Sequence, residues 1–287
     1  MRIFLLILTC LLFGCAQPSF NNDTSHYKTL FSPAMDRDMG YTVYTPPGWS
    51  PREQLPLLVM LHGANDDETT FFRYGVDQYL DGEIAAGKLP RVIVLNPQGD
   101  RGFWENWHDG SRNYRDWVLN DLMPVVQTQY NTLPCPANCF VSGVSMGAHG
   151  AMRFSYYAPN TFASVAAISG RIVSREQATD GSLKMAIMRF MLPVNRIWGD
   201  LDKLPRDGDP YVAWTEDRVL SSKPLMLAWG KHEDADIVDS NLAFAAHLSA
   251  NQRPFKQVVF NGEHRWVDWA PVIAESIRFH LGCGDPE

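Results

Sequence analysis

The stretch "CFVSGVSMGAHGAMRFSYYAP", Cys139–Pro159, passes from a short β-prone run into a helical pattern and places Ser145 at the junction. Gly143 and Gly147 flank this serine at positions where a side chain would crowd a sharp turn. A strand that turns abruptly into a helix in this way leaves the serine hydroxyl exposed, in a strained backbone conformation. The G-x-S-x-G spacing is common by chance, so it is the strand, turn and helix around it that favour a nucleophilic serine.

Strand-like and helical segments alternate on both sides of this stretch. Apolar runs ended by glycine, as in "LPLLVMLHG" and "RVIVLNPQG", are typical of buried parallel strands. The opening "YTVYTPPGW" and the later "FASVAAISG", "KPLMLAWG" and "FKQVVF" predict further strands. Helical patterns lie at residues 69–87, 114–130, 237–250 and 266–281, with a kink or restart at Pro124. This order predicts one α/β domain over residues 30–284 with a doubly wound, mostly parallel sheet.

Residues 171–222 interrupt the alternation. This segment is long, mixed in pattern and rich in Met, Trp, Asp and Pro. Parallel sheets bind ligands at their carboxyl edge, and long irregular insertions often cover such a site. We therefore expect a lid-like insertion over that edge of the sheet.

The N-terminus begins "MRIFLLILTCLLFGC", one arginine followed by a short apolar run. This pattern predicts a signal peptide of the lipoprotein type over residues 1–14, with Cys15 lipidated and residues 15–29 forming a flexible tether. An ordinary secreted protein, cleaved after a small residue such as Ala16, is the alternative. Ala16 directly after the cysteine resembles the default for outer-membrane sorting in Gram-negative bacteria. We expect an exported protein, periplasmic or at the outer membrane, held to the membrane by an N-terminal lipid.

The formal net charge is −7 and no cluster of Lys and Arg stands out, which argues against a nucleic-acid partner. Three of the five cysteines fall in the predicted domain: Cys135, Cys139 and Cys283. Export permits disulfides, so a Cys135–Cys139 bridge is plausible with Cys283 left over, and a bridge to Cys283 is the alternative. No His or Cys pair stands beside them at ligand spacing, so no metal site is predicted.

A serine nucleophile needs a base and an acid that orients it, following in the chain order Ser, acid, His. His264, in "FNGEHRWVDW", comes after a predicted strand and before the last helix. The acid is expected in "KHEDADIVD", after the strand "PLMLAWG". We select Asp234, because it comes early in the loop and leaves Asp236 to cap the following helix, with Glu233 as the alternative acid.

An oxyanion hole needs two backbone N–H groups, one just after the nucleophile and one after an early strand. Met146 supplies the first, and Ala64 in "LHGAND" supplies the second. Gly63 could instead be only a turn residue, and His62 only a buried, hydrogen-bonded side chain.

Aromatic residues are concentrated in "DRGFWENWHDGSRNYRDW". Trp104 and Trp107 lie near the expected active-site edge, where their rings could bind a sugar or a phenolic acyl group. They could equally cover the lid interface. Trp198 and Trp214 in the insertion could face the same cleft or anchor the lid.

Taken in order, "LPLLVMLHGAND", "NDLMPVVQTQY", "VSGVSMGAHGAMRFSYYAPNTFASVAAISG", "PLMLAWGKHED" and "NGEHRWVDW" resemble the esterase D family of α/β-hydrolases. This family includes S-formylglutathione hydrolases, feruloyl and acetyl xylan esterases, enterochelin esterases and mycolyl transferases. The resemblance implies a serine carboxylic-ester hydrolase with Ser145, an acid near Asp234 and His264 as its triad, and Met146 and Ala64 in the oxyanion hole.

It further implies an acyl-enzyme intermediate and no metal or organic cofactor. The expected substrate is an acylated carbohydrate, a phenolic ester or another small ester. Alternatives are acyl transfer to a sugar or lipid hydroxyl, and a non-catalytic ligand-binding lipoprotein of the same fold. The chain departs from the family pattern at Ala148, where members often carry Gly. Members also usually place the acid three residues after the loop glycine, which here is Glu233.

Overall fold

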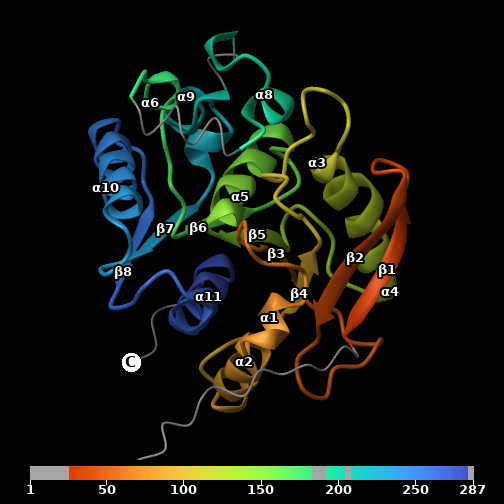
Figure 1. Ribbon diagram of the computed structural model, residues 1–287. Helices are drawn as coiled ribbons and strands as arrows, with labels where there is room; N and C mark the ends of the chain where they lie inside the picture. The colour runs from red at the N-terminus through yellow and green to blue at the C-terminus, as the bar shows by residue number, and fades with distance from the viewer. Residues whose placement is uncertain (1–25, 183–191, 204–207, 284–287) are drawn as a thin grey trace, which may run out of the picture.

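The computed structural model describes residues 26–182, 192–203 and 208–283. Its centre is an eight-stranded sheet in the order β1-β2-β4-β3-β5-β6-β7-β8 (Figure 1). The strands are β1 (Tyr27–Ser32), β2 (Arg37–Tyr44), β3 (Leu57–Leu61), β4 (Ile93–Pro97), β5 (Cys139–Val144), β6 (Ser164–Ile168), β7 (Leu225–Gly230) and β8 (Lys256–Phe260). Neighbours pair in parallel from β4 to β8 in this order, whereas β2 pairs antiparallel with both β1 and β4. The predicted doubly wound, mostly parallel sheet is confirmed.

Helices cover both faces of the sheet because the central strands are apolar on both sides. In β3, Leu57, Val59 and Leu61 enter one core, and Leu58 and Met60 enter the other. The first core is closed by α3 (Tyr114–Asp116), the π-helix η1 (Trp117–Leu122), α4 (Met123–Gln129), α5 (Met146–Tyr157) and α10 (Ala235–Ala250). The second is closed by α1 (Thr70–Arg73), α2 (Val76–Ala85) and α11 (Trp266–His280) (Figure 1).

The N-terminal hairpin differs from the prediction. Tyr27–Thr29, which we placed in the tether, begin strand β1, and β2 starts earlier than the predicted strand at Tyr41. In β1 exposed residues alternate with half-buried ones, as expected of an edge strand that has one face in water. Such a short alternating pattern gives a much weaker signal than the continuous apolar runs of the central strands.

The helical segment around Pro124 shows neither a break nor a restart, because α3, η1 and α4 follow one another without a gap. The wide π turn of η1 leads into α4, and Pro124 lies at the start of that helix. Proline is tolerated there because the first N–H groups of a helix have no partner within it. The helical segment thus continues across Pro124 and stays packed on the sheet.

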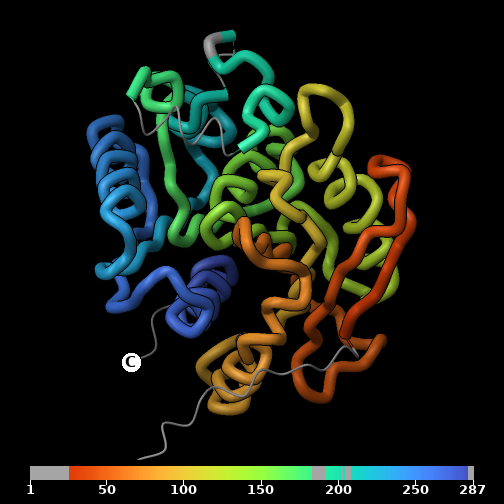
Figure 2. The backbone as a smooth tube through the Cα atoms, in the orientation of Figure 1, coloured from red at the N-terminus to blue at the C-terminus, as the bar shows by residue number. Residues whose placement is uncertain are grey.

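The insertion leaves the sheet after β6 and returns at β7 (Figure 2). It contains α6 (Arg175–Thr179), α8 (Val194–Ile197), the 3-10 helix η2 (Leu201–Lys203), α9 (Pro210–Glu216) and the 3-10 helix η4 (Leu220–Ser222). Its helices α6, α8 and α9 gather beyond α5 at one end of the molecule (Figure 1). The predicted signal peptide, Cys15 and most of the tether lie outside the described residues. Within the described ranges, no helix is long and apolar enough to span a membrane.

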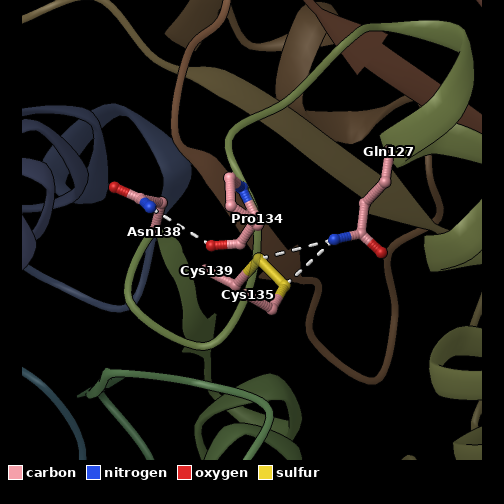
Figure 3. The surroundings of a disulfide bond; sticks show 5 residues. All are labelled: Gln127, Pro134, Cys135, Asn138 and Cys139. Carbon is pink, nitrogen blue, oxygen red and sulfur yellow. Dashed lines mark hydrogen bonds between the residues drawn. A yellow bond between two sulfur atoms is a disulfide. The ribbon is translucent and has the colours of Figure 1, made fainter.

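A disulfide joins Cys135 to Cys139, the first residue of β5, which is one of the two pairings that the sequence left open, and Cys283 is an exposed free thiol. Gln127 of α4 donates its side-chain amide to both sulfur atoms, at 3.1 Å to Cys135 and 3.8 Å to Cys139 (Figure 3). The amide of Asn138 donates to the carbonyl of Pro134 across the same turn, at 3.1 Å. The start of the strand that carries Ser145 is therefore held to α4.

Candidate active site

Ser145 occupies a sharp turn between β5 and α5. Its backbone angles are φ 56° and ψ −118°, a conformation that non-glycine residues rarely adopt. Its N–H donates to the carbonyl of Ile168 on the neighbouring strand, at 2.9 Å. A Cβ at Gly143 would overlap the backbone of Gly147, and one at Gly147 would overlap the carbonyl of Leu61. The two glycines are therefore required for the close packing that holds the serine in this turn.

His264 lies beside Ser145, with Nε2 2.9 Å from the serine Oγ. It comes from the loop between β8 and α11, and a third of its side chain is exposed. On the other side of the ring, Nδ1 lies 3.4 Å from Oε1 of Glu233, whose side chain is fully buried. Among the described residues, neither His264 Nδ1 nor either carboxylate oxygen of Glu233 has a hydrogen-bond partner within normal limits.

The choice of Asp234 as the orienting acid is corrected by this geometry. Asp234 is exposed and stands at the N-cap of α10, where its carbonyl accepts the N–H of Ile237 at 2.9 Å. Its backbone angles, φ −53° and ψ 138°, lie outside the helical region. Glu233 is buried beside the histidine, whereas Asp234 is exposed to solvent.

Ala64 and Met146 line the same cavity as Ser145. Met146 is the first residue of α5, so its N–H has no acceptor within the helix. Ala64 follows Gly63, whose carbonyl lies 2.7 Å from Nδ1 of the buried His62. Because C=O and N–H lie on opposite edges of a peptide plane, holding the Gly63 carbonyl directs the Ala64 N–H the other way.

His62 is itself held from the loop after β4. Its Nε2 accepts the N–H of Gly99 at 3.0 Å, so the ring proton lies on Nδ1 and is donated to Gly63. Burial lowers the pKa of His62, and the neutral form is therefore the one present near neutral pH. His62 is thus buried and hydrogen-bonded, which is one of the roles expected for it. Its hydrogen bond to the Gly63 carbonyl fixes the turn at Gly63.

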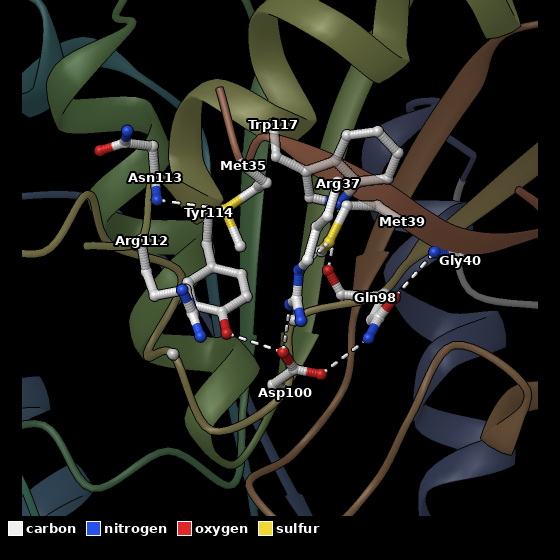
Figure 4. A network of polar contacts seen from close by, with 12 residues as sticks. Met35, Arg37, Met39, Gly40, Gln98, Asp100, Arg112, Asn113, Tyr114 and Trp117 are labelled. Carbon is white, nitrogen blue, oxygen red and sulfur yellow. Dashed lines mark hydrogen bonds and ion pairs between the residues drawn. The ribbon is translucent and has the colours of Figure 1, made fainter. Parts of the chain in front are cut away.

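A polar network centred on Asp100 secures the same loop (Figure 4). The carboxylate of Asp100 accepts Arg37 at 2.7 Å, Tyr114 at 2.7 Å and Gln98 at 2.8 Å. Gln98 in turn accepts the N–H of Gly40 on β2, at 2.7 Å. Burial by itself would raise the pKa of Asp100, but these hydrogen bonds and the charge of Arg37 outweigh it and lower the pKa.

A cavity of about 320 Å³ opens beside Ser145. Most of its lining is apolar, and much of it comes from the insertion: Val173, Ala178, Leu192, Val194, Trp198, Leu201 and Pro210, with Phe103 from the loop after β4. Arg153, Arg171 and Arg175 add positive charge to the lining. Within the described ranges, no group of three or more His, Cys, Asp or Glu is arranged to hold a metal ion.

Trp104 and Trp107 do not line this cavity, which corrects their assignment as substrate-binding residues. Trp104 is completely buried against Gly99 and Gly150, and its Nε1 donates to the carbonyl of His62 at 3.3 Å. Trp107 packs on the core and donates to the carbonyl of Gly102 at 3.2 Å. The loop takes positive φ at both Phe103 and Trp104, which turns Phe103 toward the cavity and Trp104 into the core.

Of the two tryptophans in the insertion, Trp198 lines the cavity and Trp214 is buried. Sequence reasoning missed Phe103, His149 and Arg153 as lining residues. His149 and Arg153 are four residues apart on α5, so they share a helix face, and that spacing was the available signal. Burial, and next the charge of Arg153, lowers the pKa of His149 to about 3, so this ring is neutral in the cavity.

The model of the Esterase family, described as "Putative esterase", matches residues 32–280, and the chain belongs to this family. It is 29% identical over 180 residues to Esterase Rv1288 of Mycobacterium tuberculosis, a match that covers 59% of this chain and 35% of the relative. The chain thus matches only about a third of that relative's length.

Solved structures share the fold. A ferulic acid esterase superposes with a TM-score of 0.72 at 20% identity, covering 88% of this chain and 96% of that one. FphF, a fluorophosphonate-binding serine hydrolase of Staphylococcus aureus, gives a TM-score of 0.70 at 22% identity, covering 89% and 97%. These likenesses establish the α/β-hydrolase fold, and the chemistry has to be argued from the site itself.

Proposed function

We propose that this protein is a serine carboxylic-ester hydrolase. The observation that carries the proposal is the 2.9 Å contact between Ser145 Oγ and His264 Nε2, with the buried Glu233 carboxylate on the far side of the imidazole. Nucleophile, base and orienting acid in this arrangement constitute a Ser-His-acid triad. Membership of the Esterase family supports the same reaction class.

In the proposed mechanism, His264 takes the proton of Ser145 as Oγ attacks the carbonyl carbon of the ester. The carbonyl oxygen becomes an oxyanion, which the N–H groups of Ala64 and Met146 stabilise. Glu233 keeps the proton of the neutral ring on Nδ1 and stabilises the imidazolium once Nε2 is protonated. His264 then gives its proton to the leaving alcohol, and water, activated by the same imidazole, releases the acid from the acyl enzyme.

The cavity supports a substrate with an apolar acyl group of moderate size. The rings of Phe103 and Trp198 lie 4.9 Å apart in an edge-to-face pair and both line the cavity, so they offer aromatic surface to an aryl acyl group. The fold likeness to a ferulic acid esterase supports the same choice. We propose phenolic acyl esters, including those of carbohydrates, as the first substrates to test.

Intact mass after incubation with a fluorophosphonate tests the reaction class. We expect one adduct on the protein and none on Ser145→Ala, and we expect that variant to have no esterase activity. If the folded parent protein takes no adduct and hydrolyses no ester, the proposal fails and a ligand-binding role takes its place.

The identity of the acid gives a second test. Glu233→Gln should lower kcat by roughly a thousandfold or more, because the amide can hold the wrong tautomer of His264 and cannot stabilise the imidazolium. Asp234→Asn is the matched control, one residue away and exposed, and should retain kcat within about twofold. Steady-state kinetics on a 4-nitrophenyl ester would decide, and an equal loss in both variants would contradict the assignment.

An exported, lipid-anchored location is also part of the proposal. The disulfide at Cys135–Cys139 supports it, because such bonds persist in oxidising compartments. Metabolic labelling with a palmitate analogue should mark the protein and leave a Cys15→Ser variant unmarked. A labelled Cys15→Ser variant would overturn lipidation at that residue.

A further inference from the structure

The ring of Trp269 packs directly against His264. Their centroids are 4.7 Å apart and the planes meet at 84°, an edge-to-face contact. Trp269 lies in the first turn of α11 and is only 3% exposed. Trp269 is thus a neighbour of the imidazole in addition to Ser145 and Glu233. A tryptophan in this place restricts how the ring of a partly exposed histidine can turn.

Trp269 is in turn anchored to the sheet by Ser169. Its Nε1 donates to Ser169 Oγ at 2.9 Å, and this serine is completely buried at the end of β6. Ser169 has φ 55°, in the left-handed region that non-glycine residues rarely adopt. Its N–H donates to the carbonyl of Ala228 on β7 at 2.7 Å, which fixes this conformation.

The nucleophile is attached to the same strand end. Ser145 donates its N–H to the carbonyl of Ile168, the residue before Ser169. Both reacting residues are therefore supported by the end of β6. Ser145 is held there through its backbone, and His264 is held through Trp269 and Ser169. This shared support matters because a misplacement of about 1 Å can cost roughly a hundredfold in rate.

We propose that Ser169 and Trp269 are positioning residues for the reaction, which hold the imidazole of His264 in line with Ser145. The inference rests on the proposed function for its kinetic consequence, but the geometry it asserts can be tested separately. Trp269 acts by contact with the ring, and Ser169 acts through Trp269. Neither exchanges a proton in the reaction.

Kinetics on a 4-nitrophenyl ester provide the first test. Ser169→Gly removes the acceptor while permitting the positive φ, and Trp269→Phe removes the donor while keeping an aromatic ring. We expect kcat to fall by roughly 10- to 100-fold in each, with KM changed by less than about threefold. The double variant should be no slower than the slower single variant, because both changes break one link.

Trp266→Phe is the matched control. Trp266 lies on the same helix and is 5% exposed, its Nε1 has no partner among the described residues, and its ring packs on Trp269. This variant should lose stability but keep kcat within about twofold. A similar fall in kcat in the control, unchanged kcat in Ser169→Gly, or a loss expressed in KM alone would overturn the positioning role.

A spectroscopic measurement separates this inference from the reaction itself. The ring current of Trp269 acts on the His264 proton signals, which comparison with a His264→Gln variant identifies. We expect these NMR signals to move in Ser169→Gly and to stay in place in Trp266→Phe. If they do not move in Ser169→Gly, the proposed support is wrong, whether or not the protein hydrolyses esters.

Discussion

Gly147 shows how little space the nucleophile turn leaves. The helix that begins at Met146 passes so close to the end of β3 that a Cβ at position 147 would overlap the carbonyl of Leu61. The obstacle is backbone, which cannot rotate away as a flexible side chain can. Leu61 also precedes His62 and Gly63, so pushing it outward would move the loop that carries the Ala64 N–H.

We expect Gly147→Ala to lower both stability and activity. Alanine gains about 1 kcal/mol over glycine in helix propensity, but overpacking against fixed backbone costs typically 1–3 kcal/mol. The net loss should reach up to about 2 kcal/mol in urea unfolding, and the displaced oxyanion loop should lower kcat by more than about tenfold.

Gly82→Ala provides the control for Gly147→Ala. Gly82 lies inside α2, and nothing lies within 4 Å of a Cβ added there. The Gly82→Ala protein should therefore be more stable than the parent by about 0.5–1 kcal/mol. A Gly147→Ala protein as stable and active as the parent would show that the helix can shift without cost.

At the scale of elements, Arg153 ties the insertion to α5. Its guanidinium donates to Glu105 at 2.5 Å, to the carbonyl of Gly208 at 2.7 Å and to Tyr157 at 2.6 Å. The side chains of Arg153 and Glu105 are 11% and 3% exposed. Burial raises the pKa of Glu105, and the positive charge of Arg153 opposes this rise by stabilising the carboxylate. One wall of the cavity thus depends on a buried ion pair.

Arg153→Met should be strongly destabilising, because it leaves the Glu105 carboxylate buried without its cation. Breaking such a pair typically costs about 3–5 kcal/mol. The double variant Arg153→Met with Glu105→Gln should recover much of that loss, since no unpaired charge remains. Urea unfolding of the parent, both single variants and the double variant measures the coupling, and strictly additive losses would contradict it.

Sequence patterns predicted the elements that have strong local signals. The central strands are continuous apolar runs, and the G-x-S-x-G turn follows from small residues between a strand and a helix. The edge strand β1 was missed because its alternation is short. The direction of Glu233, Phe103 and Trp104 depends on loop dihedrals, which neighbouring residue types do not determine.

The support of the site by Ser169, Trp269 and His62 was beyond sequence reasoning for another reason. Each acts through a contact with a residue far along the chain: Ser169 with Trp269, and His62 with Gly99. Residue spacing carries no signal for such pairs. The glycines and the histidine at strand ends could be recognised from the sequence, whereas their contacts depend on the three-dimensional fold.

At the scale of the whole molecule, buried neutral histidines link the sheet to its covering helices. His280, in the last turn of α11, lies 2.9 Å from Ser142 Oγ on β5 and 2.7 Å from Ser164 Oγ on β6. Burial lowers the pKa of His280 to about 3. An unfolded chain would hold this histidine in water, with the ordinary pKa of about 6.5.

The free energy of unfolding should therefore decrease as the pH falls below about 6.5. Between that value and about 3, the unfolded state binds a proton at residue 280 that the folded state excludes, so acid favours unfolding. One such proton gives a slope of about 1.4 kcal/mol per pH unit.

His280→Gln can keep hydrogen bonds to the two serines but does not titrate. The free energy of unfolding of this variant, measured in urea at pH 7, 6 and 5, should fall less steeply with decreasing pH than that of the parent. The two slopes should differ by up to about 1.4 kcal/mol per pH unit. His62 and His149 titrate in both proteins, so the difference between the two curves isolates His280, and parallel curves would show that its ring is not held neutral by the fold.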